Sequence, residues 1–266
     1  MSKQKILIGA MNNPLKDIIS EIERIAALGL NFIDLTIEPP SLEIDNFKGK
    51  KILQALKDCN LKVITHTIPR LPFGSPYPQI RKATLEVLKK LLDCSLQFGS
   101  QQLSVHYDLS CSHVSSEYRI NWHAEILSAF CEIAAKSKTK IILENMPSTM
   151  TSQIVEIRKI LDQVNDLGIL FDVSHALIEG GMDKIYQYLD FMGGRISHIH
   201  FSSNEGVIDQ HLPVGALRYE KIKWPDLIAK IKSTGYDKTI TLEVFTLNEP
   251  YLVLSKKLIL QWWNSK

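Results

Sequence analysis

Short apolar segments alternate along the chain with longer segments in which apolar residues recur every three or four positions. Leu15, Ile18, Ile22 and Ile25 show the second pattern, which places apolar side chains on one face of a helix. The short apolar runs have the length and composition of buried strands. Strands are predicted at 5–10, 31–38, 61–67, 102–107, 140–145, 168–172, the start of 195–215, and 239–244; helices are predicted from Pro14, after an Asn13 N-cap, to Gly29, and at 49–60, 78–98, 117–136, 151–165, 182–192, 225–234 and 249–263.

Strand and helix thus alternate eight times without a linker, which is typical of parallel sheet. Eight units of this length predict a closed α/β barrel, so the predicted fold is a single (β/α)8 TIM barrel over residues 1–266. A doubly wound open sheet is the rival arrangement. It would separate polar residues that end different strands, and no Gly-rich dinucleotide-binding motif follows any predicted strand.

Polar residues with metal-binding chemistry stand at or just past the C-terminal ends of the predicted strands. In a closed barrel these ends meet at one mouth, where active sites of this fold are found. A lone histidine is usually a hydrogen-bonded core residue. Polar residues at the ends of six successive strands are harder to explain in that way. The strand-end set is His66, His106, Glu144, Asp172 with His175 just beyond, His198, His200 and Glu243, and the loop after the seventh strand adds Asp209 and His211.

His198 and His200 are two residues apart, so on a strand both side chains point to the same face of the sheet. Asp209 and His211 repeat this spacing in the following loop. Imidazole and carboxylate together suit zinc or manganese, and iron is also compatible. His198 lies one step deeper than His200 and is interpreted as a supporting group and not a ligand. His113 and His123 fall outside the strand ends and are predicted to be surface residues.

The overall composition favours no nucleic-acid or membrane partner. Net charge is +2, from 31 basic and 29 acidic residues, so there is no basic field for nucleic acid. The apolar run near the first residue is too short for a signal peptide or a membrane span. Cys59, Cys94, Cys111 and Cys131 are widely spaced and are read as free thiols of a cytoplasmic protein, the first, second and fourth buried on helices.

Five motifs in order give the chain a resemblance to a known superfamily. They are LEN at 143–145, FDVSHA at 171–176, HIHFSSN at 198–204, DQHLPVG at 209–215 and GYDKTITLEVF at 235–245. The pattern resembles the xylose isomerase-like TIM-barrel superfamily, which includes endonuclease IV and predicted sugar phosphate isomerases/epimerases. The resemblance covers the whole chain. It supports the superfamily more strongly than it supports any substrate.

By resemblance to the one-metal ketose epimerases, Glu144, Asp172, His200 and Glu243 are the metal ligands, and the two glutamates also move the proton. His175 is expected to touch a substrate oxygen. A divalent metal would acidify the C–H next to the carbonyl and stabilise the enediolate. The epimerase pattern also has an arginine shortly after the seventh-strand histidine, where this chain has Gly206 and Val207.

Endonuclease IV uses more metal ligands, and each has a counterpart here. By this resemblance the first metal takes His66, His106 and Glu144, the second takes Glu144, Asp172, His200 and Glu243, and the third takes His175, Asp209 and His211. The DNA-handling segments do not match: His106-Tyr107-Asp108 replaces a His-Pro-Gly turn, and residues 11–14 replace a Gly-rich loop.

The sequence therefore predicts two or three divalent ions and a metal-dependent isomerase or epimerase of a sugar or sugar phosphate, working by proton transfer through an enediolate. The alternative is a multinuclear metallophosphoesterase of the endonuclease IV type, acting on abasic-site DNA or a small phosphodiester. The expected partner is a small sugar, and the oligomeric state is left open. A non-enzymatic metal-binding barrel has no support, since no proposed ligand is replaced.

Three residues outside the metal set are candidates for substrate binding. The loop 68–78 has four prolines and is expected to be stiff, presenting Arg70 and Phe73 close to His66. Arg70 is either a clamp for a phosphate or carboxylate or an ordinary surface arginine. Glu38 ends the second strand and is expected to face the substrate or to support the residues that do.

Overall fold

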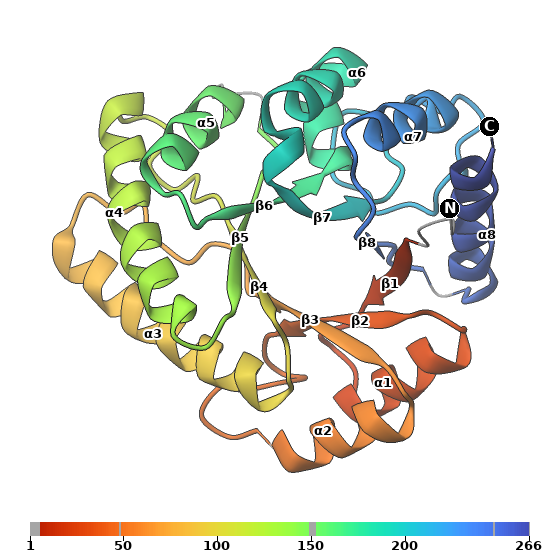
Figure 1. Cartoon of the computed structure of the whole chain (residues 1–266), viewed down its shortest axis with the longest axis horizontal. Helices are drawn as coiled ribbons and strands as arrows, with labels where there is room; N and C mark the ends of the chain where they lie inside the picture. Colours follow the sequence, from red (N-terminus) through yellow and green to blue (C-terminus); the bar gives the residue numbers. More distant parts are fainter. Residues whose placement is uncertain (1–5, 48, 149–152, 247, 266) are drawn as a thin grey trace.

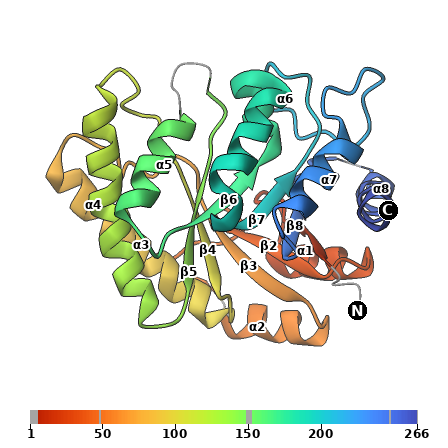
Figure 2. The same cartoon turned by 45° about the horizontal axis from the view of Figure 1, so that its top comes forward.

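The strands form a closed parallel barrel in the order β1 to β8, with β1 paired to β8 (Figure 1). The computed structural model describes residues 6–47, 49–148, 153–246 and 248–265. Closure confirms the predicted TIM barrel, and the open-sheet alternative is wrong. Helices surround the strands on the outside (Figures 1 and 2).

The observed elements lie close to the predicted ones. The strands are β1 Leu7–Met11, β2 Phe32–Ile37, β3 Lys62–Thr67, β4 Gln102–His106, β5 Lys140–Glu144, β6 Gly168–Asp172, β7 Ile196–Phe201 and β8 Thr239–Leu242. The helices are α1 Ile18–Ala27, α2 Gly49–Asp58, α3 Pro78–Gln97, α4 Ser116–Ala135, α5 Gln153–Gln163, α6 Val173–Met192, α7 Trp224–Ser233 and α8 Pro250–Asn264, with a 3-10 turn at Gly193–Arg195. The predicted starts at residues 5 and 151 lie outside the described residues.

The predicted start of α1 is wrong. Asn13 does not cap the helix; its side-chain oxygen accepts a hydrogen bond from the backbone N–H of Leu15 at 2.9 Å, which makes a local turn. The helix begins at Ile18, and Asp17 caps it by accepting from the backbone N–H of Ser20 at 2.9 Å. Both Asn13 and Asp17 are suitable N-cap residues, and the structure uses Asp17, which directly precedes the apolar face of the helix.

Helix α6 begins earlier than predicted, immediately after β6. Asp172 caps it by accepting from the backbone N–H of His175 at 2.7 Å. The helix is broken at Gly180 and Gly181, and Gly181 has a φ of 72°, a region that favours glycine. The prediction recovered only the second part. The first part matters for the site, because it carries His175.

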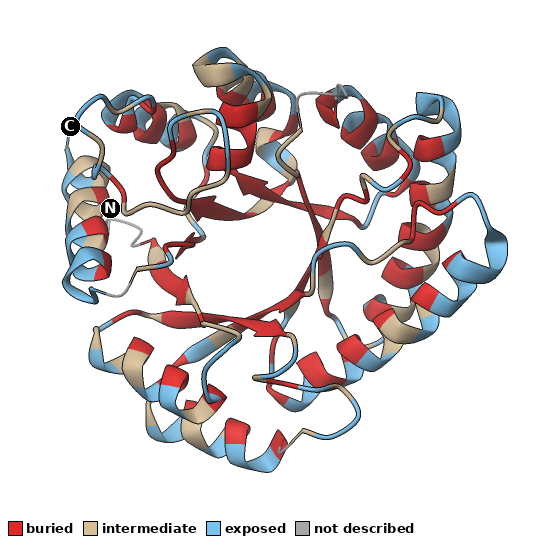
Figure 3. Cartoon of the chain, turned by 180° about the vertical axis from the view of Figure 1, so that it is seen from behind, coloured by how far each residue is buried: buried red, intermediate tan, exposed pale blue. Residues whose placement is uncertain are grey.

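The apolar core lies between the strands and the surrounding helices. On β2, Ile33, Leu35 and Ile37 belong to this core, while Asp34 and Thr36 alternate with them and point into the barrel. Figure 3 shows strands buried along almost all their length and helices buried only in bands. Apolar side chains thus hold the outside of the barrel, which leaves its interior free to carry polar groups.

All four cysteines are free. Burial raises the pKa of Cys94 to about 11 and that of Cys131 to about 12, so both thiols are unreactive near neutral pH. Cys111 is also buried, whereas Cys59 is only partly buried and follows the last residue of α2. Among the described residues, no helix is both long and apolar enough to cross a membrane.

Candidate metal centre and cavity

Polar residues from six strands meet at the C-terminal mouth of the barrel. His106, Glu144 and Asp172 are the last residues of β4, β5 and β6. Parallel registry pairs His106 with Glu144 and Asp172 with His200, which sets these side chains at one level. The strand order therefore assembles residues that lie far apart in the sequence.

Glu144, Asp172, His200 and Glu243 form a four-residue group whose potential ligand atoms all lie within 4.8 Å of one another. His200 Nδ1 is 2.9 Å from Glu243 Oε2, 3.8 Å from Glu144 Oε1 and 3.9 Å from Asp172 Oδ2. Glu144 Oε2 and Asp172 Oδ2 are buried without a hydrogen-bond partner among the described residues. One imidazole and three carboxylates, with orphaned oxygens, fit a divalent cation.

The electrostatics of this group show how much it favours positive charge: although burial opposes it, Glu243 and Asp34 raise the pKa of His200 well above its usual range. Burial raises the pKa of Asp172 to about 8, and repulsion from Glu243 and Glu144 adds to that effect. Three buried carboxylates at this spacing cannot all stay ionised without compensation. A proton on Asp172 relieves the repulsion in the metal-free protein, and a divalent cation would take that proton's place.

His66, His106 and Glu144 form a three-residue group beside the first. His66 Nε2 lies 3.0 Å from His106 Nε2 and 3.1 Å from Glu144 Oε2, while His106 Nε2 lies 3.3 Å from the same oxygen. Tetrahedral zinc with bonds of about 2.0–2.1 Å would place its ligand atoms roughly 3.3 Å apart. Glu144 is thus shared, with Oε2 facing this group and Oε1 facing His200.

His175, Asp209 and His211 lie at the rim. Asp209 Oδ2 is 3.0 Å from His175 Nε2 and 3.0 Å from His211 Nε2. Ser203 and Leu212 exchange backbone hydrogen bonds of 2.8 and 2.9 Å, which folds this loop back over the barrel. Among the described residues, the groups of ligand atoms within 4.8 Å do not include these three together.

A cavity of about 250 Å³ opens above these groups. Glu38, His66, His106, Glu144, His175, Asp209, His211 and Glu243 line it with Met11, Pro14, Thr36, Thr67, Pro69, Met146 and Phe245. None of these lining residues is a lysine or an arginine. The cavity therefore offers acidic and metal-binding groups to a ligand, walled by apolar side chains.

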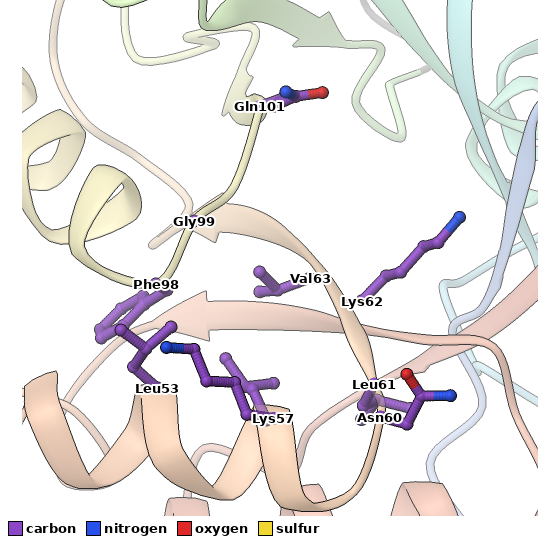
Figure 4. Close-up of a pocket in the computed structure, with 10 residues that line it drawn as sticks. Leu53, Lys57, Asn60, Leu61, Lys62, Val63, Phe98, Gly99 and Gln101 are labelled. Atoms are coloured by element: carbon purple, nitrogen blue, oxygen red, sulfur yellow. The ribbon is translucent and has the colours of Figure 1, made fainter.

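A larger cavity, of about 530 Å³, lies at the opposite end of the barrel (Figure 4). It is bounded by α2, the first residues of β3 and the segment after α3, with Leu53, Lys57, Val63 and Phe98 among its lining residues. None of its lining residues is a histidine, aspartate or glutamate. Size alone therefore does not identify the chemical site.

A family model described as "Xylose isomerase-like TIM barrel" matches residues 22–259. The chain belongs to this family. An uncharacterized protein of Methanocaldococcus jannaschii is 30% identical over 212 residues, covering 74% of this chain and 69% of that one. Fructoselysine 3-epimerase of Escherichia coli O157:H7 is 23% identical over 197 residues, covering 67% and 68%.

Solved structures of sugar epimerases share the family fold. A D-tagatose 3-epimerase-like protein superposes with a TM-score of 0.82 at 23% identity, covering 97% of each chain. D-psicose 3-epimerase of Clostridium cellulolyticum H10 superposes with a TM-score of 0.78 at 16% identity, covering 97% of this chain and 98% of that one. At these identities the likeness establishes the fold alone.

Two of the predicted substrate-binding residues, Arg70 and Phe73, do not line the cavity at the barrel mouth. Phe73 is 1% exposed, and its ring packs against His123 with centroids 5.2 Å apart. Arg70 is exposed, with a φ of 69°, and is not among the residues that line the cavity. Glu38 does line it. The loop after β3 does reach the cavity, through Pro69, but its aromatic residue turns into the core.

His123 is not a surface residue, which corrects the prediction; His113 is exposed as expected. His123 Nδ1 donates to the backbone carbonyl of Arg119 at 2.7 Å, and Nε2 accepts from the backbone N–H of Asp108 at 3.1 Å. Asp108 Oδ2 in turn accepts from the backbone N–H of Gly74 at 2.9 Å. These bonds tie the loop after β3 to α4, beside the cavity.

Arg119 of α4 and Glu156 of α5 form a buried ion pair, with side chains 7% and 5% exposed, and Tyr107 donates its hydroxyl to Glu156. Arg119→Ala should destabilise the protein by about 3–5 kcal/mol, because it leaves a buried carboxylate unpaired. Urea unfolding would measure this. Lys89→Ala, which removes an exposed pair with Glu86, is the control and should cost about 0.5 kcal/mol or less. Equal losses in both variants would contradict the buried pair's role.

Sequence reading missed Asp34, which lies beneath both groups on β2 and is fully buried. Its Oδ2 accepts from His200 Nε2 at 2.8 Å and from the Thr241 hydroxyl at 2.9 Å. His198, one step deeper than His200 as expected, places Nε2 3.2 Å from the same oxygen. Asp34 stands in mid-strand, so the search of strand ends did not find it. The polar alternation of Asp34 and Thr36 within an apolar strand was the available signal.

Proposed function

We propose that the chain is a divalent-metal-dependent sugar epimerase that acts on a ketose by proton transfer at the carbon next to the carbonyl. The observation that carries this proposal is the four-residue group, in which two glutamates from separate segments, Glu144 and Glu243, flank one imidazole. The proposal is supported by the names of one relative, fructoselysine 3-epimerase, and of two structural neighbours, a D-tagatose 3-epimerase-like protein and D-psicose 3-epimerase.

Glu144, Asp172, His200 and Glu243 would hold the ion, with zinc or manganese favoured and iron compatible. A bound divalent cation would supply Lewis acidity to a substrate carbonyl. The three carboxylates would bring the negative charge that balances such an ion. His200 would contribute a neutral nitrogen and so add no further charge.

The two glutamates would carry the proton. One carboxylate accepts the proton from the carbon next to the carbonyl as that C–H bond breaks, and the electron pair moves onto the carbonyl oxygen as an enediolate. The other glutamate, in its acid form, then delivers a proton to the opposite face of the same carbon. Removal from one face and return to the other inverts the configuration. His175, which lines the cavity, would hydrogen-bond a substrate oxygen.

An unphosphorylated ketose suits the cavity better than a sugar phosphate. No lysine or arginine occurs among the described residues that line it, and its polar lining is made of four acidic residues, four histidines and two threonines. A phosphate placed there would face Glu38 and Asp209 without the lysine or arginine that usually binds phosphate. Hydroxyl groups, in contrast, can donate to these carboxylates.

Protein loaded with manganese or zinc should convert at least one free ketose in a panel of tetruloses, pentuloses and hexuloses into its epimer, and chromatography would detect the product. The matching ketose phosphates should react with a kcat/KM at least tenfold lower. Absence of conversion across the panel, with bound metal verified by elemental analysis, would count against an epimerase.

The three-residue group favours a second candidate, a metallophosphoesterase. Two metal groups that share Glu144 could bracket a phosphorus atom. Cleavage of an abasic-site duplex or of bis(p-nitrophenyl) phosphate tests this directly. Cleavage without any ketose conversion would make the phosphoesterase the better description, while inactivity on both phosphodiesters leaves the epimerase in front.

A further inference from the structure

Asp34 stands behind both metal groups and touches neither cavity nor solvent. One carboxylate oxygen, Oδ2, is the acceptor for His200, Thr241 and His198 at 2.8, 2.9 and 3.2 Å. The other, Oδ1, is buried without a hydrogen-bond partner among the described residues and lies 3.7 Å from His66 Nδ1. Asp34 therefore approaches one histidine of each group.

The bond from Asp34 decides which nitrogen of His200 can bind a metal. A neutral imidazole carries a proton on one nitrogen and a lone pair on the other. Because Nε2 donates to the Asp34 carboxylate, the lone pair lies on Nδ1. Nδ1 is the nitrogen that faces Glu243, Glu144 and Asp172.

The same logic applies to His66. Its Nδ1 is buried without a partner among the described residues, and Asp34 Oδ1 is the carboxylate oxygen that lies in front of it. Closing that 3.7 Å separation by several tenths of an ångström makes a hydrogen bond. The lone pair would then lie on Nε2, which is 3.1 Å from Glu144 Oε2 and 3.0 Å from His106 Nε2.

We propose that Asp34 is the positioning residue of the metal centre, and that it fixes the ring tautomer and orientation of His200 and His66 together. This inference rests on the proposed metal-dependent function. One buried carboxylate then prepares both groups at once, so its loss weakens both. Carboxylates that orient metal-binding histidines in this way typically change metal affinity by about 10–100-fold.

Asp34 could in principle be a ligand itself, because its oxygen, His66 and His200 also have ligand atoms within 4.8 Å. Three hydrogen-bond donors already surround Oδ2, and the residue is fully buried. An ion there would also need the His200 Nε2 lone pair, which withdraws Nδ1 from the four-residue group. The two roles differ in stoichiometry: losing a ligand removes an ion, whereas losing a positioning residue weakens binding.

The test compares wild type with Asp34→Asn, which keeps the side-chain shape and removes the charge. Nitrogen-15 NMR of metal-free, histidine-labelled protein should show a hydrogen-bonded Nε2–H on His200 that exchanges slowly with solvent in wild type and clearly faster in the variant. Zinc competition against a chromogenic chelator should show an unchanged number of ions bound about 10–100-fold more weakly at both groups.

Two further variants keep the test decisive. Ser104→Ala is the matched control, because Ser104 is buried two residues before His106 and its hydroxyl has no hydrogen-bond partner among the described residues; zinc affinity should be unchanged. Thr241→Val removes one hydrogen bond to Asp34 and should weaken zinc binding a few-fold, which decides the matter where Asp34→Asn does not fold.

Wild-type zinc affinity and an unchanged exchange rate of the His200 Nε2–H in Asp34→Asn would overturn the inference, as would loss of one whole ion, which would make Asp34 a ligand. If Asp34→Asn does not fold, a wild-type zinc affinity in Thr241→Val would also overturn the inference. Failure of wild type to bind zinc would instead contradict the proposed function, and the exchange of the His200 Nε2–H, which needs no metal, would still test the role of Asp34 separately.

Discussion

Glu144→Gln and Glu243→Gln should each lower ketose turnover by about a hundred- to ten-thousandfold, the range by which positioned acids and bases accelerate reactions. Each change preserves the side-chain shape but removes the oxygen that accepts or returns the proton. Both residues also belong to the four-residue group, so metal must be supplied in excess and bound metal measured by elemental analysis. Steady-state kinetics at full metal occupancy then isolate the proton-transfer step.

Glu38→Gln is the matched control for these substitutions. Glu38 lines the same cavity but belongs to none of the groups that could hold a metal. Its kcat should stay within about tenfold of wild type, and any effect should fall mainly on KM, because a lost substrate contact that is equal in ground and transition states changes KM alone. Turnover by metal-loaded Glu144→Gln at the Glu38→Gln level would contradict the assigned role of Glu144.

The second large effect is on metal content. Wild type should bind at least two zinc or manganese ions, and His66→Ala/His106→Ala should lose one while keeping the other. Glu144, Asp172, Asp209 and Glu243 bring four carboxylates to one mouth, and a single divalent ion would leave about half of that charge to be balanced by protons, which a second ion would replace. The histidines add ligands without adding charge.

Elemental analysis and thermal unfolding measure this effect together. At metal concentrations about 1,000-fold above Kd, binding to the native state stabilises it by roughly 4 kcal/mol, so a chelator should lower the Tm by several degrees. A single ion in wild type, unchanged by the double substitution, would remove the three-residue group from the account. The four-residue group would then remain as the only supported site.

The barrel and most of its mouth followed from the sequence, because each relevant signal is local. An apolar run marks a strand, and a histidine or acid at its end needs only the closed topology to find its neighbours. His106, Glu144 and Asp172 are the clearest cases, since each is the last residue of its strand. Asp209 and His211 were predicted from their two-residue spacing and from the resemblance of the DQHLPVG motif.

What the sequence could not reveal depends on contacts between distant segments. Asp34 is in mid-strand, and its value arises from His66 and His200 across the barrel. His123 looks like a polar residue on a surface helix, yet the loop after the neighbouring strand β3 covers it with Phe73. Such burial is decided by tertiary packing, and no local periodicity encodes it.

The central claim is proton transfer at the carbon next to a ketose carbonyl, and solvent deuterium tests it most directly. Metal-loaded protein in deuterium oxide, given the ketose that it converts, should place one deuteron at that single carbon in the epimer formed, and proton NMR would show the loss of that one signal. Glu144→Gln and Glu243→Gln should suppress the exchange. An epimer that forms with its original proton retained at that carbon, or no exchange in any ketose by fully metal-loaded protein, would contradict the account.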